Sequence, residues 1–491
     1  KMVTLSEVLI IFVVCLFIVQ FLKLQWIRKP LPPGPAPIPF IGNFLHVSLK
    51  VDHNILDKLA KTYGNIYTVW MGHKPVVILH GFPAVKEGLT THADDVAGRL
   101  DTPFFQRLAN GKGIFLSSGV IWKHERRFGI ATLRKLGMGN KGIERGIQVE
   151  ARRLMEFFQS TDGKAVDPAY PIVLAVSNVI CTVVFGHPFS LEDETFQKLV
   201  KAFHFLINFA NSSSQILYDI FPWLMRHLPG PQREVFVLCD FVHSFIRKEI
   251  RIHRERDKLD DPEDFIDYYL AQMAKTKNSA TYKHDEDNMV QSVFDLFLGG
   301  TETTATTLRW ALLYMVAYPD IQEKVQQELD TVLGSSQSIC YEDRKKLPYT
   351  HAVVHEIMRF CSVVLIGLPR QAVRDTTLLG YPVPKGSMII ANIYSVLTDP
   401  EYWEKPFEFD PGHFLDEEGN FFCREAFLPF SIGFRICLGE QLARMELFII
   451  FCSLLQAFRF TLPDGVKEAN TQCILGSTVQ PHPYKICAFL R

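Results

Sequence analysis

The chain has 491 residues, of which 52 are Lys or Arg and 53 are Asp or Glu, so its formal net charge is -1. This balance excludes a protein that binds nucleic acid through a basic excess. The ten cysteines form no CxxC pair, so neither a zinc site nor a small disulfide scaffold is expected and the thiols should be reduced. The 39 phenylalanines within a 47% hydrophobic composition indicate a large apolar interior or pocket.

The N-terminal stretch, residues 3–22, is apolar and long enough to cross a bilayer as a helix, with Glu7 as its one charge. A cleavable signal peptide is the alternative, but no small-residue cleavage site follows. Lys23, Arg28 and Lys29 come directly after the stretch, which favours a cytosolic position for the rest of the chain. We therefore expect a transmembrane signal anchor at residues 1–22, and no glycan at the Asn211 sequon.

The next segment, residues 23–40, begins basic and continues with the proline-rich run PLPPGPAPIPF. Because proline fixes φ and lacks an amide donor, this segment should be an extended and stiff hinge. A proline-rich ligand for a signalling module is the alternative, which the position between anchor and globular body disfavours.

The body, residues 41–491, reads mostly as helix. Residues 66–81 predict two strands around a short turn, and residues 388–396 predict a further strand. The long helical patterns span residues 146–159, 288–318, 320–333 and 439–458. The predicted fold class is therefore mainly α with small β-sheets.

Two short motifs follow one another near residue 130. Trp122 and Arg126 lie one helical turn apart and form either an anion-binding pair of donors or a surface stacking pair. Gly137, Gly139 and Gly142 satisfy the dinucleotide pattern GxGxxG, but basic ATLRKL precedes them where that pattern needs an apolar strand. A loop between two helices is the better interpretation.

The helix predicted from residue 288 contains VFDLFLGGTETTATTL, in which two glycines and five threonines interrupt an apolar pattern. Each interior glycine costs ~1 kcal/mol relative to alanine, and threonine is also a poor helix former. Threonine hydroxyls can bond the carbonyl one turn earlier and bend the helix. Glu302 beside Thr303 then suggests a proton relay, and a close helix–helix packing patch is the alternative.

Two further motifs lie in the C-terminal third of the chain. Glu356 and Arg359 have helical spacing, which by itself indicates no more than an ion pair. Cys437, in FSIGFRICLG, precedes a predicted helix, whose exposed amides and dipole stabilise a thiolate. Gly433 and Gly439 would let the backbone approach a flat partner, and the charge of Arg435 would suit an acidic group on it. This combination suits an iron porphyrin with propionates.

Together, WxxxR, GGTETT, ExxR and FSIGFRICLG resemble, in this order along the chain, the motifs of the cytochrome P-450 superfamily of haem-thiolate monooxygenases. The similarity extends from the proline-rich hinge to the C-terminal PHPYKICAFLR. PFSIGFRICLGEQLARMELF and FDPGHFLD look typical of vertebrate microsomal members of family two. The resemblance implies the cytochrome P-450 fold, with one catalytic domain at residues 41–491.

The resemblance also implies roles for matching residues. Cys437 would be the axial ligand of the iron in haem b (iron protoporphyrin IX), and its thiolate would favour O–O cleavage. Glu302 and Thr303 would deliver protons during oxygen activation. The propionates would be held by Trp122, Arg126, Arg435, Arg370 and Arg99.

A buried network of Glu356, Arg359 and His413 would support the haem side. His413 stands where much of the superfamily has arginine. By the same resemblance, the pocket walls would include Ile114, Phe115, Leu298, Gly299, Val364 and Leu368. Leu365 departs from the proline usual in related sequences, which puts the local backbone and the regioselectivity in doubt.

The implied reaction inserts one oxygen atom of O2 into lipophilic substrates by hydroxylation or epoxidation. Polyunsaturated fatty acids, steroids and xenobiotics are the expected classes, because the implied pocket residues are nearly all apolar. Fatty acids are favoured because FPWLMRHLPGP resembles the fatty-acid epoxygenase branch. Residues 216–230 would dip into the membrane and admit such substrates, with ordinary core as the alternative. The protein would sit in the endoplasmic reticulum membrane with its catalytic domain on the cytosolic side.

The chain has no flavin motif, so electrons from NADPH would come through a separate flavoprotein. The resemblance names NADPH–cytochrome P-450 reductase, with cytochrome b5 as a further candidate partner. A basic surface could steer an acidic partner, or form an ordinary solvated helix face; it consists of Lys123, Arg127, Arg134 and Lys135. The alternative functions are a haem-thiolate isomerase that acts on hydroperoxides without reductase, and a non-enzymatic haem sensor.

Overall fold

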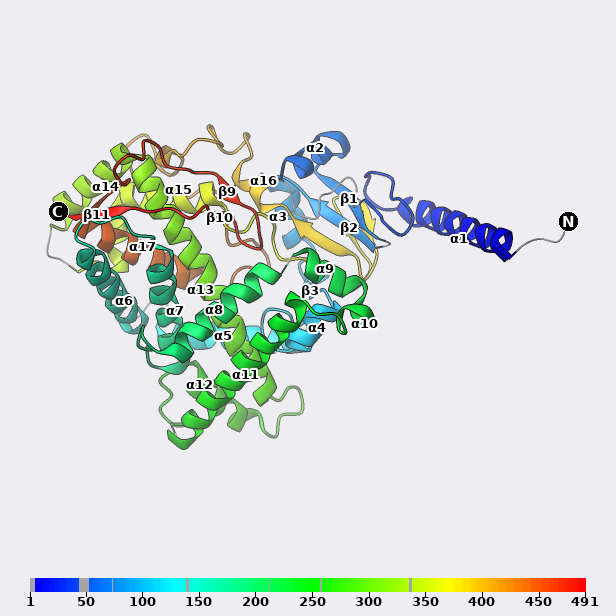
Figure 1. Ribbon diagram of the computed structural model, residues 1–491, viewed down its shortest axis with the longest axis horizontal. Helices are drawn as coiled ribbons and strands as arrows, with labels where there is room; N and C mark the ends of the chain where they lie inside the picture. The colour runs from blue at the N-terminus through cyan, green and yellow to red at the C-terminus, as the bar shows by residue number, and fades with distance from the viewer. Residues whose placement is uncertain are drawn as a thin grey trace. The chain divides into compact units, whose positions relative to one another are not determined.

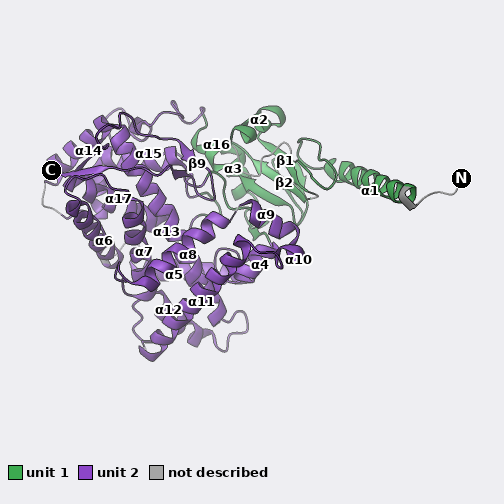
Figure 2. Ribbon diagram, viewed as in Figure 1, with its two compact units in different colours: residues 1–100, 365–399, 431–436 green, residues 101–364, 400–430, 437–491 purple. Residues whose placement is uncertain are grey.

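The computed structural model describes residues 5–43, 53–72, 74–137, 141–210, 212–256, 258–334 and 338–491. The first four residues of the expected anchor, Gly139 and Asn211 lie outside the described residues. The chain forms two compact units (Figure 2). Unit 1 consists of residues 1–100, 365–399 and 431–436, and unit 2 of residues 101–364, 400–430 and 437–491.

Unit 1 is built on a five-stranded sheet with the order β1-β2-β7-β4-β3 (Figure 1). The predicted strand pair is confirmed as β1 (Ile66–Met71) and β2 (Lys74–Leu79), which pair antiparallel. β2 pairs in parallel with β7 (Met388–Ala391), so the sheet joins segments from distant parts of the chain. β4 (Arg370–Gln371) connects β7 to β3 (Gly98–Arg99).

The prediction of a strand over residues 388–396 is wrong beyond residue 391. Asn392 accepts a hydrogen bond on its side chain from the Ser395 amide, 3.2 Å away, and thereby caps the short helix α16 (Ile393–Leu397). An Asn cap of this kind satisfies an amide at the start of a helix, so it ends the strand. The other elements of unit 1 are α2 (His53–Tyr63), α3 (Phe82–Thr90), β5 (Thr376–Leu378) and β6 (Tyr381–Val383).

The first helix, α1 (Leu5–Arg28), continues six residues past the expected end of the anchor at residue 22. Among the described residues it is the one helix long and apolar enough to cross a membrane. Nearly all of its side chains from residue 8 to residue 22 are exposed, in contrast to the buried core helices of the protein.

The proline-rich segment is extended, as predicted, but it packs on β1 rather than standing free. The Pro33 carbonyl accepts the Thr68 amide at 2.9 Å, and a Cβ on Gly34 would lie 1.9 Å from the Thr68 carbonyl oxygen. The Arg28 guanidinium donates to the Gly34 carbonyl at 2.9 Å, which joins the end of α1 to this segment. The segment is therefore part of the packed body of unit 1.

Unit 2 is mostly helical and is arranged around α13 (Glu286–Ala317), which packs against α7, α8, α11, α15 and α17. The other helices are α4 (Pro103–Ala109), α5 (Gly119–Leu136), α6 (Lys141–Ser160), α7 (Ala169–Phe185), α8 (Glu194–Phe209), α9 (Ser213–Ile220), α10 (Pro222–Met225), α11 (Pro231–Arg256), α12 (Phe265–Thr276), α14 (Pro319–Val332), η1 (Tyr341–Lys345), α15 (Pro348–Cys361), η2 (Pro411–Phe414) and α17 (Glu440–Ala457). Its strands are β8 (Phe458–Thr461), β9 (Cys473–Ile474), β10 (Gln480–Pro481) and β11 (Cys487–Leu490).

The long predicted helices are confirmed. Residues 288–318, 320–333 and 439–458 differ from α13, α14 and α17 by no more than two residues at either end, and α6 begins five residues before residue 146. Gly137 ends α5 with φ 114°, which fits the interpretation of GMGNKG as a loop between helices. All ten cysteines are free, as the sequence predicted.

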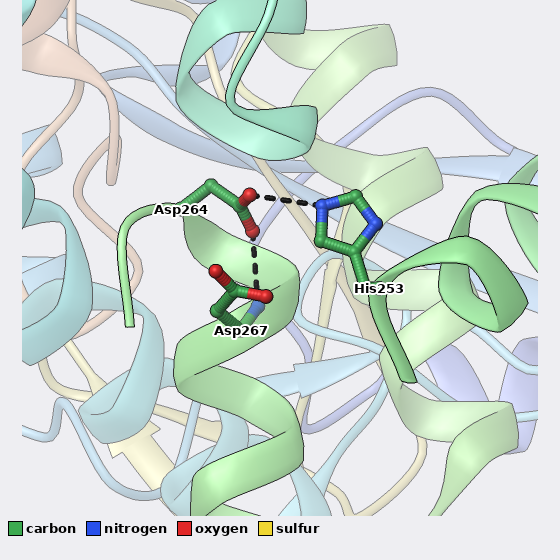
Figure 3. A group of neighbouring side chains, drawn as sticks. All are labelled: His253, Asp264 and Asp267. Atoms are coloured by element: carbon green, nitrogen blue, oxygen red, sulfur yellow. Dashed lines mark hydrogen bonds and ion pairs between the residues drawn. The ribbon is translucent and has the colours of Figure 1, made fainter. Parts of the chain in front are cut away.

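A buried polar group joins α11 to α12 (Figure 3). Asp264 caps α12 by accepting the Asp267 amide at 2.9 Å, and its other oxygen lies 2.9 Å from Nε2 of His253. The Nδ1 of His253 lies 2.7 Å from the Glu249 carbonyl. Burial lowers the pKa of His253, but the bond and charge of Asp264 outweigh it and raise the pKa above its ordinary value. Asp264 therefore caps α12, and His253 balances its charge.

Candidate haem-binding and catalytic site

Cys437 lies in unit 2, three residues before the start of α17. Its amide donates to the Phe430 carbonyl at 3.0 Å, and its side chain keeps exposed surface. Burial raises the pKa of the Cys437 thiol above its ordinary value, while bonds from the backbone amides of Gly439 and Glu440 act in the opposite direction. The amides at the start of the helix thus lower the pKa of the thiol, as the sequence predicted, but burial raises this pKa by more.

Helix α5 carries the predicted pair Trp122 and Arg126. Trp122 is buried, and the charges of Arg126 and Cys437 act on each other. One turn further, a Cβ on Gly129 would lie 3.3 Å from Cδ1 of Leu438, the residue that follows Cys437. The structure therefore brings the WxxxR motif next to the cysteine within unit 2.

The three other predicted propionate ligands lie in unit 1, on or beside the end of its sheet. Arg99 and Arg370 are paired across β3 and β4. Arg370 donates to the Ile432 carbonyl at 3.0 Å, and Arg435 donates through Nε to the Ala97 carbonyl at 2.9 Å. Backbone carbonyls thus orient the guanidinium groups of Arg370 and Arg435.

Gly433 is also required by the fold of unit 1. Its φ is 80°, and a Cβ would lie 2.2 Å from the Leu89 carbonyl oxygen in unit 1. A side chain at this position would be strained and would also collide with the backbone. By contrast, a Cβ on Gly439 would meet no atom within 4 Å, so the backbone at the start of α17 leaves open space.

These observations fit a haem whose iron is bound by Cys437. The residue keeps exposed surface although its thiol is partly desolvated, no atom lies within 4 Å of a Cβ on Gly439, and the charge of Arg126 acts on the sulfur. Because the protein alone holds the pKa of this thiol high, a metal cation is what would keep it as a thiolate.

Glu356, Arg359 and His413 form the predicted network, and all three are buried in unit 2. Arg359 binds both oxygens of Glu356, through Nε at 2.7 Å and Nη2 at 2.6 Å. His413 Nδ1 lies 3.2 Å from the same carboxylate, and the guanidinium also donates to the carbonyls of Pro406 and Glu408 at 2.9 and 3.0 Å. The network ties α15 to the chain that leads toward Cys437.

The two glycines of α13 have different surroundings. A Cβ on Gly300 would lie 2.4 Å from Cδ1 of Ile180 on α7, whereas a Cβ on Gly299 would meet nothing within 4 Å. Close helix packing therefore explains Gly300. Gly299 faces open space, and its predicted place in the pocket wall stays a prediction.

Glu302 and Thr303 are neighbours on α13 but have separate partners. The Thr303 hydroxyl donates to the Gly299 carbonyl at 2.7 Å, which is the predicted bond to the previous turn. The buried Glu302 carboxylate accepts from Gln480 Nε2 at 2.8 Å and from the Thr306 hydroxyl at 3.4 Å, and His204 Nδ1 lies 3.3 Å away. Within the described chain, no hydrogen bond joins Glu302 directly to Thr303.

The predicted pocket residues are distributed over both units. Ile114, Phe115, Leu298, Gly299 and Val364 belong to unit 2, and Leu368 belongs to unit 1. The loop of Ile114 and Phe115 is fixed to α13 by Asp295, whose Oδ2 accepts both amides at 2.8 Å. Burial raises the pKa of Asp295 to about 7, against the effect of these bonds. Sequence reasoning missed Asp295, although a lone acid within VFDLFL was a signal for a buried polar contact.

A second missed carboxylate, Glu125, fixes α5 between Trp122 and Arg126. It accepts from the hydroxyls of Tyr269 and Tyr282 at 2.8 Å each and from Ser292 at 3.1 Å. Burial raises the pKa of Glu125, and these hydroxyls lower it in part. The helix that carries the WxxxR motif is therefore held to α12 and α13 by one carboxylate.

Comparison with known proteins agrees with this geometry. A family model described as cytochrome P-450 matches residues 32–488. Cytochrome P-450 2J2 from Homo sapiens is 42% identical over 460 residues, which cover 94% of this chain and 91% of that protein. Cytochrome P-450 2J5 from Mus musculus is 40% identical over 476 residues, 97% of this chain and 94% of the relative.

Cytochrome P-450 2C8 from Homo sapiens is 41% identical over 461 residues, which cover 94% of both chains. The predicted similarity to family two is thereby confirmed, and a monooxygenase is favoured over an isomerase or a sensor. The chain belongs to the cytochrome P-450 family: it is a haem-dependent monooxygenase that receives electrons from NADPH through a redox partner and oxidises lipophilic substrates.

Proposed function

We propose that the chain is an endoplasmic-reticulum monooxygenase whose catalytic domain faces the cytosol. Residues 1–22 would be the membrane anchor, residues 23–40 the hinge and residues 41–491 the catalytic domain. The exposed apolar side chains of α1 support the anchor, and Lys23, Arg28 and Lys29 after the apolar stretch support the cytosolic side. The observation that carries the proposal is Cys437 ahead of α17, with Arg126 acting on its sulfur.

Cys437 would hold the iron, and bound haem would supply oxygen activation, with the thiolate favouring O–O cleavage. Trp122, Arg126, Arg435, Arg370 and Arg99 would bind the propionates through their N–H donors. We assign the remaining predicted site residues three roles. Glu356, Arg359 and His413 would keep the backbone near the cysteine in place, and Glu302 and Thr303 would supply protons. The residues that would contact substrate are Ile114, Phe115, Leu298, Gly299, Val364 and Leu368.

NADPH–cytochrome P-450 reductase is the proposed electron donor, with cytochrome b5 as a second one. Lys123, Arg127, Arg134 and Lys135 are all exposed on α5, the helix that also carries Arg126. A basic patch of this kind would attract an acidic partner and raise its association rate. Charge reversal at Lys123 and Arg127 should slow reduction at low salt, whereas reversal at Lys86 on α3 is the matched control.

Polyunsaturated fatty acids are the proposed natural substrates, with steroids and xenobiotics as further ones. The proposed pocket residues are apolar, which suits lipophilic ligands. The neighbouring helices α9 and α10 are labelled in Figure 1. Five apolar residues on these helices and at their junction are exposed: Leu217, Ile220, Phe221, Trp223 and Leu224. Such a patch would insert into a bilayer and place the entrance beside dissolved lipid.

Carbon monoxide binding to the reduced protein tests the haem ligation. The wild-type protein should show the red-shifted Soret band of sulfur ligation, and Cys437→Ser should lose it. A retained band in Cys437→Ser would contradict the assignment, and Cys361→Ser is the control at another free cysteine, which is buried. Product analysis with reductase, NADPH and a panel of lipids and drugs then tests the substrate class.

A further inference from the structure

Glu302 has three hydrogen-bonding partners among the described residues, and they differ in what they can do with a proton. Gln480 donates through an amide and Thr306 through a hydroxyl, at 2.8 and 3.4 Å. Neither group titrates near neutral pH. The third partner, His204 at 3.3 Å, is the one whose ring can gain and lose a proton in that range.

His204 extends from the buried carboxylate to the protein surface. Its side chain is 50% exposed, whereas that of Glu302 is 4% exposed. Nδ1 faces Glu302, and Nε2 lies 2.9 Å from the amide nitrogen of Asn208, one turn further along α8. The two ring nitrogens therefore lie on the two sides of the boundary between solvent and interior.

We propose that His204 is the residue that resupplies Glu302 with protons from solvent. The proposal rests on the proposed role of Glu302 in proton supply. It does not require contact between His204 and the haem or the substrate.

The transfer balances in two steps. A solvent acid gives a proton to Nε2 and forms the imidazolium, and Nδ1 then gives its proton to Oε2 of Glu302. The products are a neutral imidazole and a carboxylic acid, and the carboxylate returns when the acid passes its proton inward. Asn208 donates to Nε2 of the neutral ring and would turn its amide oxygen toward the protonated ring.

The local charges suit this role. The hydrogen bond to Glu302 and its charge raise the pKa of His204, while burial and the charge of Arg309 lower it by less. Helix α8 packs against α7, α11 and α13. In the described part of the chain, the charged groups that act on this ring are Glu302 and Arg309, both on α13.

His204→Asn is the sharpest variant, because asparagine can place an amide N–H near the position of Nδ1 but cannot be protonated. We expect the amount of product per NADPH to fall by up to about tenfold, less than the ~10²-fold typical of losing a proton donor itself. In the wild type, product per NADPH should decline as rising pH deprotonates His204. We expect this decline to be absent in His204→Asn. His187→Gln is the matched control, since His187 also faces a carboxylate, Glu249, at 3.7 Å.

The double variant with Glu302→Gln distinguishes the two proposals. If His204 acts through Glu302, adding His204→Asn to Glu302→Gln causes no further loss. If Glu302→Gln lowers product per NADPH and His204→Asn does not, the inference on His204 is wrong and the role of Glu302 stands. If Glu302→Gln has no effect, the proposed role of Glu302 fails as well.

Histidine NMR gives a readout that does not depend on turnover. In the full-length reduced protein with carbon monoxide bound, the His204 signal is identified by its loss in His204→Asn. Its pKa should fall in Glu302→Gln and stay unchanged in Glu249→Gln. An unchanged pKa in Glu302→Gln would show that the two groups are uncoupled and would overturn the inference.

Discussion

Glu356 and Glu302 are both buried carboxylates of unit 2, but their partners differ in kind. Glu356 is held on both oxygens by Arg359, and both side chains are 0% exposed. Glu302 has neutral donors and one half-exposed histidine. Arginine stays charged at all relevant pH values, whereas histidine titrates near neutrality. A permanent cation suits Glu356 to its proposed structural role, and a titratable partner suits Glu302 to the proposed exchange of protons.

The largest expected effect is at the permanent pair. Arg359→Leu leaves the Glu356 charge buried without its cation and should lower the free energy of unfolding by ~3–5 kcal/mol. Urea unfolding followed by circular dichroism measures this change. The free energy of unfolding of Arg359→Lys should lie between those of the wild type and Arg359→Leu, because lysine keeps the charge but not the two parallel hydrogen bonds. Wild-type stability in Arg359→Leu would show that Glu356 does not depend on a fixed cation.

Asp295 sharpens the comparison, because its partners are two backbone amides and Gln291 rather than a cation. Its pKa is raised from 3.8 to about 7, so the folded protein favours the neutral acid. This contribution to stability is complete below about pH 4 and is lost as the pH rises toward 7.

Relative to Asp295→Asn, the wild-type protein should therefore lose about 1–4 kcal/mol of stability between acidic and mildly alkaline pH. Unfolding in urea across that range measures the difference between the two proteins. A difference that does not vary with pH would show that Asp295 is ionised throughout. A changed product distribution in Asp295→Ala would further show that this carboxylate holds the Ile114–Phe115 loop.

The glycines of α13 provide a smaller test in the same helix. Gly300→Ala places a methyl group against Ile180 and should destabilise by ~1–3 kcal/mol. Gly299→Ala meets open space and should stabilise the helix by up to ~1 kcal/mol while altering substrate binding. Thermal unfolding and substrate titration separate the two results, and equal destabilisation by both variants would contradict the division of roles.

The smallest stability effect is expected at His204. Because this side chain is half exposed, His204→Asn should change the free energy of unfolding by less than about 1 kcal/mol. A loss as large as that of Arg359→Leu would show that the histidine is a structural clamp between α8 and α13. Urea unfolding of His204→Asn beside Arg359→Leu makes this comparison directly.

The sequence predicted the elements whose signal is local. The α13 and α17 helices follow from long periodic patterns, and the β1–β2 pair from two apolar runs around a short turn. The strand over residues 388–396 was too long because Asn392 was not recognised as a helix cap. The packing of the proline-rich segment on β1 was also missed, since nothing in its composition indicates the Thr68 amide as a partner.

For the candidate site, contacts within one helix were predictable from spacing, whereas contacts between distant parts of the chain were not. Glu356 and Arg359 are three residues apart, so their contact follows from helical spacing. His204 and Glu302 are 98 residues apart, and Gln480 and Glu302 are 178 apart. Such contacts depend on how α8 and the C-terminal segment pack on α13, which a single sequence does not reveal.

The proline-rich segment of unit 1 has a consequence for where the foldable body begins. Leu31, between Pro30 and Pro32, packs with Leu24 and Trp70, and the Pro33 carbonyl accepts a hydrogen bond from the Thr68 amide. A truncation at residue 41 would therefore remove a lining of β1 and uncover Trp70, whereas a cut within the apolar part of α1 would keep that lining. The first helix and the sheet are joined by packed side chains and hydrogen bonds rather than by a flexible linker. A change in the tilt of the helix would therefore be transmitted to the sheet.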